Sequence, residues 1–252
     1  TLVGAAGAGG TGFGVAADSL GRAYIVGFTS YNGCTPQALQ NCFPTTPGAV
    51  IPGSNVVNGS NGNGNGFVSV LNPSLSTLLY STILGDPNGA QSNTSEAFGV
   101  TVDPNGNFYV VGVTGSPSLP TTAGAFQRTL GVANSIPLAG FAAKFGPVTS
   151  NGAILTYLTY LEATGVGFGD FPGGVAADSQ GNAYIGGYTN SPTFPVTPGA
   201  YNTVCPLNGA RLCPAAFVTK LNPTGTGLVW SALVEPAGFF RPFNSMHKGI
   251  HI

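Results

Sequence analysis

The stretch GVAADSQGNAYIGGYT at residues 174–189 decides the fold, because two close copies of it occur earlier in the chain. The copies read GVAADSLGRAYIVGFT at 14–29 and GVTVDPNGNFYVVGVT at 99–114. Each consists of two short runs rich in Val, Ile, Tyr and small residues, separated by Asp, Gly and polar residues. This is the composition of two β-strands joined by a tight turn. The sequence therefore predicts a hairpin that occurs three times.

The predicted turns share an aspartate and a glycine at fixed spacing. The pairs are Asp18 and Gly21, Asp103 and Gly106, and Asp178 and Gly181. A carboxylate in such a turn accepts hydrogen bonds from the local backbone, and glycine supplies a positive φ. We therefore expect a structural role for these six residues, with acid–base catalysis by the aspartates as the alternative.

Each hairpin is followed by three further segments of common composition. A proline-threonine segment comes first: FPTTPGA at 43–49, LPTTAGA at 119–125 and FPVTPGA at 194–200. A third apolar run follows: FVSVLNP at 67–73, FAAKFGP at 141–147 and FVTKLNP at 217–223. A fourth run closes the unit: LLYSTIL at 78–84, LTYLTYL at 155–161 and LVWSALV at 228–234. Helical periodicity is missing, and 20 prolines disfavour helices, so each unit is expected to hold four strands in two hairpins.

Four-stranded units in tandem are typical of a β-propeller, whose blades usually number about four to eight. The expected fold is all-β, with three propeller-type blades and a ring that is incomplete within this chain. The expected boundaries are the end of a preceding blade at 1–12, blades at 13–85, 86–162 and 163–234, and a tail at 235–252. Small residues such as Gly14 and Gly99 suit the innermost strand, and Gly27, Gly112 and Gly187 suggest close backbone approach in the second strand.

The repeat also resembles a known family, the bacterial β-propeller repeat of secreted and cell-surface proteins that is often called the seven-bladed propeller repeat. The matching pattern is G-x-A-x-D-x-x-G-N-A-Y-x-x-G-x-T, then F-P-T-T-x-G-A, A-F-V-x-K-L-N-P-x-G and L-x-Y-S-T-x-L-G. Repeat three matches best, and repeat one departs most through the insertion GSNVVNGSNGNGNG at 53–66. The resemblance covers roughly residues 13–234. It implies a propeller fold and a bacterial extracellular or cell-surface location, and it brings no catalytic residues.

Composition excludes several classes of partner. Charged residues make up only 6% of the 252 residues and the net charge is −1, so no basic surface for nucleic acid is expected. No apolar run is long enough to span a membrane as a helix. The Gly/Asn-rich stretch at 58–66 lacks the Lys-Ser/Thr of a phosphate-binding loop and is expected to be a surface loop.

The four cysteines form two pairs of identical C-x7-C spacing, Cys34 with Cys42 and Cys205 with Cys213. Both pairs lie in loops rich in Pro, Asn and Gly, so two local disulfides and an oxidising compartment are expected. A zinc site is an alternative, although zinc ligands usually have the shorter C-x2–4-C spacing and added histidines. Free thiols are the third reading.

Other candidate chemistry is sparse. His247 and His251 are the two histidines and are expected in a flexible tail, with metal binding as the alternative. Calcium binding by Asp103, Asn105 and Asn107 is a further alternative, but the glycine spacing is not that of an EF-hand. No cofactor is therefore expected.

The remaining polar and aromatic candidates recur at repeat positions or lie near them. Glu162, Glu235, Asp170 and Glu96 are expected as solvated loop charges, with paired carboxylates for glycoside chemistry as the alternative. Lys144 and Lys220 are expected on a partly exposed strand face. Tyr80, Tyr157 and Trp230 are expected to pack between blades, with carbohydrate stacking as the alternative.

These patterns favour a non-catalytic, extracellular structural or adhesive protein, which either associates with itself as an oligomer or filament or is part of a larger surface protein. Self-association through strand edges is the expected partner mode, with Thr1–Gly4 pairing outside its own repeat, and polysaccharide is a second expected partner. A secreted glycan-binding or glycan-active propeller that uses loop carboxylates is the alternative function. Convergence of two carboxylates outside the turns, in one cleft, would favour the enzyme.

Overall fold

The computed structural model describes residues 9–30, 42–53, 64–87, 94–130, 138–163, 169–204 and 213–236. Across these ranges the chain forms β-strands, turns and connecting segments and contains no helix. Accordingly, the described residues include no helix that could cross a membrane. The all-β fold class expected from the sequence is confirmed.

The strands form three separate four-stranded antiparallel sheets, one for each repeat. Sheet 1 contains β1 (Gly10–Ala17), β2 (Ala23–Thr29), β3 (Asn65–Leu71) and β4 (Leu78–Leu84). Sheet 2 contains β5 (Ser95–Val102), β6 (Phe108–Thr114), β7 (Ala139–Phe145) and β8 (Leu155–Leu161). Sheet 3 contains β9 (Asp170–Ala177), β10 (Ala183–Thr189), β11 (Ala215–Leu221) and β12 (Leu228–Pro236). Strand order follows chain order in every sheet, which is the arrangement of propeller blades.

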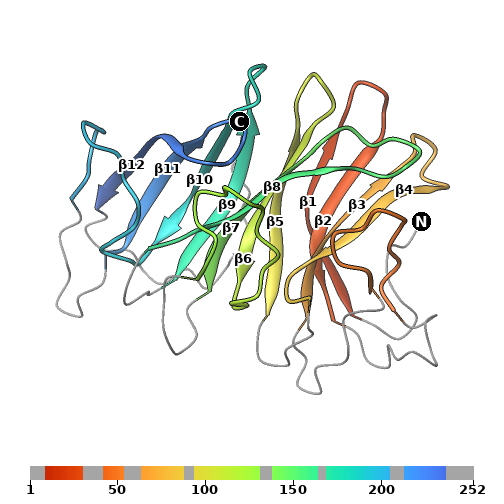
Figure 1. Ribbon diagram of the computed structural model, residues 1–252, viewed down its shortest axis with the longest axis horizontal. Coiled ribbons are helices and arrows are strands. Elements are labelled where there is room, and N and C mark those ends of the chain that lie inside the picture. The colour runs from red at the N-terminus through yellow and green to blue at the C-terminus, as the bar shows by residue number, and fades with distance from the viewer. Residues whose placement is uncertain are drawn as a thin grey trace.

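The three sheets lie side by side, with sheet 2 between the other two (Figure 1). The first strands β1, β5 and β9 are neighbours, so they form the crowded inner side of the arrangement. Glycine is required there: a Cβ on Gly14 would lie 2.7 Å from the Phe98 carbonyl oxygen. A Cβ on Gly99 would lie 3.2 Å from the carbonyl oxygen of Gly173. The inner position expected for these small residues is confirmed.

Each sheet carries the same irregularity between its first two strands. The pairing register shifts between Gly12 and Gly14 in β1, and between Ala97 and Gly99 in β5. The equivalent shift in sheet 3 falls opposite Gly186 and Gly187. A β-bulge of this kind strengthens the local twist. It also brings the first strand so close to the second that a Cβ on Gly112 would lie 2.0 Å from the Glu96 carbonyl oxygen.

The proline-threonine segment folds back along the outer strand of its own sheet. Thr46, Thr122 and Thr197 donate backbone hydrogen bonds of 2.9–3.1 Å to Ser81, Leu158 and Ser231. A second backbone bond follows in each repeat: Ile83 to Ile51, Tyr160 to Gln127 and Leu233 to Asn202. These bonds use backbone groups of β4, β8 and β12 that an added strand would need. The outer edges are therefore partly blunted, which weakens the expectation that the chain associates through strand edges.

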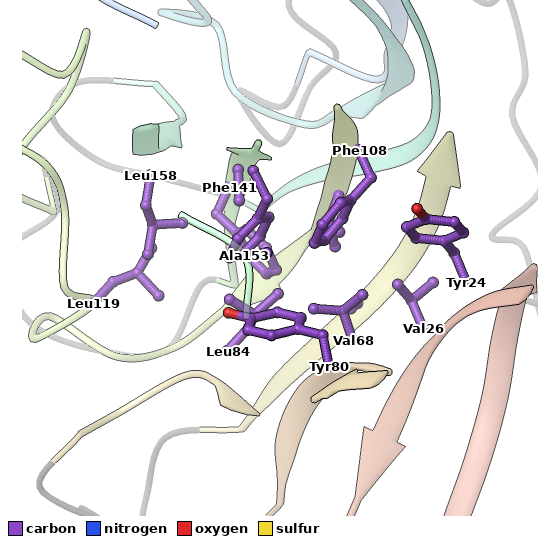
Figure 2. Packing of buried hydrophobic residues seen from close by; sticks show 14 of the residues in the cluster. Tyr24, Val26, Val68, Tyr80, Leu84, Phe108, Leu119, Phe141, Ala153 and Leu158 are labelled. Carbon is purple, nitrogen blue, oxygen red and sulfur yellow. The ribbon is translucent and has the colours of Figure 1, made fainter. Parts of the chain in front are cut away.

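The apolar core lies between the sheets (Figure 2). The seam between sheets 1 and 2, called seam 1–2, joins Tyr24, Val26, Val68, Val70, Tyr80 and Leu84 to Phe108, Val110, Phe141, Ala143, Phe145, Leu158 and Tyr160. The seam between sheets 2 and 3, called seam 2–3, joins Tyr109, Val111, Ala142, Tyr157 and Leu161 to Ala183, Ile185, Phe217, Leu221 and Leu233. Across seam 1–2 the rings of Tyr24 and Phe108 lie 5.2 Å apart. Burial of these side chains supplies the main favourable term in holding the sheets together.

Candidate interaction faces

Every sheet has two faces that are defined by the seams. The trailing face points toward the following sheet, and in sheet 2 it consists of Tyr109, Val111, Ala142, Lys144, Tyr157 and Leu161. The leading face points toward the preceding sheet, and in sheet 2 it includes Val100, Val110, Phe141, Ala143, Leu158 and Tyr160. Alternation along the strands fixes this division, because neighbouring side chains of a strand point to opposite faces. Residues at the same repeat position are called equivalent below.

The trailing face of sheet 3 carries the equivalents of seam residues: Tyr184, Gly186, Val218, Lys220, Trp230 and Val234. Burial along the third strand shows the difference between the sheets. All seven residues of β7 are buried, whereas β11 alternates between buried and half-buried residues. Leu84 and Leu161 are fully buried in seams, but their equivalent Val234 is 45% exposed. The trailing face of sheet 3 is therefore a partly exposed copy of a surface that is buried at both internal seams.

The proline-threonine segment adds to the trailing face. Val50 and Phe126, at equivalent positions, pack against the core of their seams. The Phe126 backbone N–H also donates to the carbonyl oxygen of Gly225 in sheet 3, at 2.8 Å. Their equivalent in the third repeat, Tyr201, is 87% exposed. An aromatic side chain thus extends the exposed surface beside sheet 3.

The leading face of sheet 1 is exposed on its inner side and covered on its outer side. Phe43 and Ile51 pack on Phe67 and Ile83 and bury the outer part. Val15 on the inner strand is 73% exposed, whereas its equivalents Val100 and Val175 are partly buried against seam cores. Sheet 1 therefore presents an exposed copy of the inner part of a leading face.

The repeated aspartates lie in the turns and accept hydrogen bonds from the backbone and from a tyrosine. Asp103 Oδ1 accepts the backbone N–H groups of Asn105 and Asn107, at 2.9 and 3.0 Å. Its Oδ2 lies 2.7 Å from Asn107 Nδ2 and 2.9 Å from the Tyr109 hydroxyl. Asn107 thus turns its amide nitrogen, a donor, toward the carboxylate in the loop considered for calcium. Both carboxylate oxygens are engaged within the turn.

The other two aspartates make the same contacts. Asp18 accepts from the backbone of Leu20 and Arg22 and from the Tyr24 hydroxyl, and Asp178 accepts from Gln180, Asn182 and Tyr184. Burial acts to raise the pKa of Asp18, but hydrogen bonds from Arg22 and Tyr24 outweigh it and the pKa is lowered. The glycines of these turns, Gly21, Gly106 and Gly181, have φ values of 75°, 82° and 85°.

A basic side chain crosses each seam to a turn of the following sheet. Arg22 of sheet 1 donates from Nη1 to the carbonyl oxygen of Val148, at 3.0 Å. Lys144 of sheet 2 donates from Nζ to the carbonyl oxygens of Gly181 and Pro223, at 3.1 and 3.2 Å. Sequence reasoning missed both contacts, because the partner carbonyl oxygens belong to another repeat.

Lys144 is more buried than the sequence predicts. Alternation predicts a partly exposed side chain, but Lys144 is only 7% exposed, because sheet 3 covers the face on which it lies. Burial lowers its pKa, while Asp103 and Asp178 act in the opposite direction. Its ammonium lies 5.1 Å from the centre of the Tyr109 ring. Lys220, the equivalent residue in sheet 3, is half-buried as expected.

Three of the acidic residues expected as solvated loop charges are placed differently. Glu162 and Asp170 are buried, and Asp170 and Glu96 belong to strands β9 and β5. Asp170 accepts hydrogen bonds from the Thr189 hydroxyl and from the Ala163 backbone N–H. Burial raises its pKa, and these hydrogen bonds offset the effect in part. The side chain of Glu235 lies outside the described residues.

Several sequence-based candidates cannot be placed. Cys34, Cys205, His247, His251 and Thr1–Gly4 lie outside the described residues. Neither of the described cysteines, Cys42 and Cys213, is a free thiol, and both are buried. Their pairing with Cys34 and Cys205 stays a prediction. The sequence predicts a surface loop for the Gly/Asn-rich stretch at 58–66. Asn65 and Gly66 correct this prediction, because they begin β3 and pair with β2.

The described ranges contain no group of three or more His, Cys, Asp or Glu side chains that is arranged to hold a metal ion. The polar groups that recur in these ranges are the turn aspartates, their tyrosines and the basic residues of the seams. Each of them bonds to other groups of the chain. The arrangement that repeats most regularly is therefore the contact surface between neighbouring sheets, which combines apolar packing with hydrogen bonds that fix how the sheets align.

Residues 79–119 and 156–194 match the family model of the beta-propeller repeat SBBP. These two segments are therefore similar to beta-propeller repeats of the SBBP family. Each begins within the outer strand of one sheet, β4 or β8, and continues through the first two strands of the next sheet. Each matched segment therefore crosses a seam and contains residues from both sides of the contact between blades. A comparison with curated proteins gives no match to the chain.

Proposed function

We propose that the chain is a non-catalytic extracellular structural protein whose activity is assembly through its two end faces. The observation that carries the proposal is the exposure of residues whose equivalents are buried or partly buried at the seams. Val234 and Tyr201 are exposed at the trailing end, and Val15 at the leading end. The trailing face of one blade fits the leading face of another at two internal seams, so the same complementarity is available between chains. The extracellular location is supported by the resemblance of the repeats and by the two C-x7-C spacings of the cysteines, which favour disulfides.

The mode of assembly that follows is head to tail. A trailing face packs on a leading face, so sheet 3 of one chain docks on sheet 1 of a second copy. Such a heterologous contact gives a closed ring if the rotation closes and an open filament if it does not. The three described sheets of each of two copies would together supply six blades, within the usual range of about four to eight for propellers.

Aspartate substitutions at the two end faces test the proposal. We expect Val234→Asp and Val15→Asp each to lower the molar mass of the assembly, because a docked chain would bury the new carboxylate without a partner. Ile154→Asp is the matched control: Ile154 is 80% exposed in the turn between β7 and β8, on neither end face. Light scattering after size-exclusion chromatography measures the mass. An assembly that survives both end-face substitutions, or that is lost equally in the control, would contradict the proposal.

A further inference from the structure

We propose that Lys220 sets the register of the docked chain, by donating hydrogen bonds to the carbonyl oxygens of Gly21 and Pro73 of a second copy. The inference rests on the proposed function and assigns a specific polar contact to the interface. Apolar faces alone tolerate small shifts, whereas a buried ammonium permits only those positions that supply it with acceptors. A lysine on this face would therefore select one docking position.

Seam 2–3 shows the contact in its formed state. Lys144 and Lys220 occupy the same position in the third strand of their sheets, opposite Tyr157 and Trp230. The acceptors of Lys144 are the carbonyl oxygen of the turn glycine Gly181 and that of Pro223 in the next sheet. The equivalents of these two residues in sheet 1 are Gly21 and Pro73. Both are exposed, so their carbonyl groups lie in accessible turns.

The Lys220 side chain is oriented like that of its buried equivalent, Lys144, over a tyrosine ring of the neighbouring strand. Its ammonium lies 4.6 Å from the centre of the Tyr184 ring, as Lys144 lies over Tyr109. The polar contacts of Lys220 are within sheet 3: Nζ is 2.7 Å from the Tyr184 hydroxyl and 3.2 Å from Asp178 Oδ2. The Lys220 ammonium has three N–H donors. Docking would direct donors to the carbonyl oxygens of Gly21 and Pro73 of the second copy, while Asp178 stays beside the ammonium.

The turn glycine is what makes room for the lysine. A Cβ on Gly181 would lie 2.8 Å from Lys144 Nζ, so a larger residue there would displace the ammonium. Gly21 has the same backbone conformation, with a φ of 75°, and no side chain. Sheet 1 of a second copy therefore offers Lys220 the same opening. At seam 1–2 the equivalent of the lysine is Val70, and Arg22 bonds to the Val148 carbonyl oxygen instead. A basic contact to a turn carbonyl is thus present at both internal seams.

The test compares the association constants of three chains by sedimentation velocity over a range of concentrations. Lys220→Met removes the ammonium and keeps a long apolar side chain, and Arg128→Met removes an exposed charge from a loop of sheet 2. We expect Lys220→Met to weaken association about tenfold or more, the size of a lost hydrogen bond to a charged group, and Arg128→Met to leave it unchanged. Circular dichroism and thermal melting check that both variants fold.

Labelling of amines provides a second measurement on the unsubstituted chain. We expect Lys220 to react with a soluble amine reagent at dilution and to be protected at concentrations at which the assembly forms. Unchanged or tighter association of Lys220→Met, together with loss of assembly in Val234→Asp, would overturn the role of Lys220 and leave face docking intact. A chain that stays monomeric at every concentration, with Lys220 reactive throughout, would overturn both the proposed function and this inference.

Discussion

At the scale of single residues, two buried tyrosines, Tyr160 and Tyr157, differ in the hydrogen bonds that their hydroxyl groups make. Tyr160 donates a hydrogen bond to the Ser116 carbonyl oxygen at 2.7 Å and accepts one from the Leu119 backbone N–H at 3.0 Å. The Tyr157 hydroxyl is equally buried, in the other seam, and has no hydrogen-bond partner among the described residues. A buried hydroxyl without a partner loses its hydration and gains nothing in return.

Phenylalanine substitutions measure this difference. Tyr160→Phe leaves a buried N–H and a buried carbonyl without their partner, so we expect the free energy of unfolding to fall by about 1–3 kcal/mol. Tyr157→Phe removes a hydroxyl that bonds to no described group, and we expect a change between zero and a gain of about 1 kcal/mol. Urea denaturation of both variants gives the two values. Equal losses at the two positions would show that the Tyr157 hydroxyl has a partner.

At the scale of strands and sheets, much of the fold follows from sequence. The runs at 78–84 and 155–161 coincide with β4 and β8, because β-branched and aromatic residues bounded by turn residues identify strands. The sequence does not show which faces meet. The burial of Lys144 results from contacts with the next repeat, and alternation within a strand contains no information about them. The role of the proline-threonine segments was missed for the same reason, since their bonds go to strands over 30 residues away in the chain.

Alanine substitutions test the bulge between the first two strands. A Cβ on Gly112 would lie 2.0 Å from the Glu96 carbonyl oxygen, a backbone atom that cannot move aside without disturbing β5. We expect Gly112→Ala to lower the free energy of unfolding by about 1–3 kcal/mol or more. A Cβ on Gly173 would meet no atom within 4 Å, so Gly173→Ala should be neutral or stabilise by up to about 1 kcal/mol. Thermal melting measures both, and a tolerated Gly112→Ala would contradict the close approach of the strands.

At the scale of the whole molecule, burial of tyrosines predicts sensitivity to alkali. Burial raises the pKa values of Tyr24, Tyr109 and Tyr157 far above the ordinary value near 10, and that of Tyr160 to about 12. Above pH 10 the unfolded chain releases phenolic protons that the folded chain keeps, so stability falls as pH rises. Lys144 has the opposite effect on stability, because its lowered pKa makes the folded chain lose this proton at a lower pH than the unfolded chain does. The effect of this single lysine is smaller than the combined effect of the buried tyrosines.

The alkaline prediction is measured by urea unfolding between pH 8 and pH 11.5, with tyrosinate absorbance followed in parallel. We expect stability to be nearly constant to about pH 10 and to decline beyond it. The buried tyrosines should ionise together with unfolding, because burial in the folded chain opposes the loss of their protons. Ionisation of all tyrosines near pH 10 without loss of structure would contradict the burial described for the seams.

We propose that the faces of the end blades pack on further blades of the same kind. Sedimentation equilibrium of the unsubstituted 252-residue chain, from low to high micromolar concentration, tests it most directly. We expect a molar mass that rises with concentration to at least twice the chain mass of 25.2 kDa. A folded particle that keeps the mass of one chain across the whole range would contradict it.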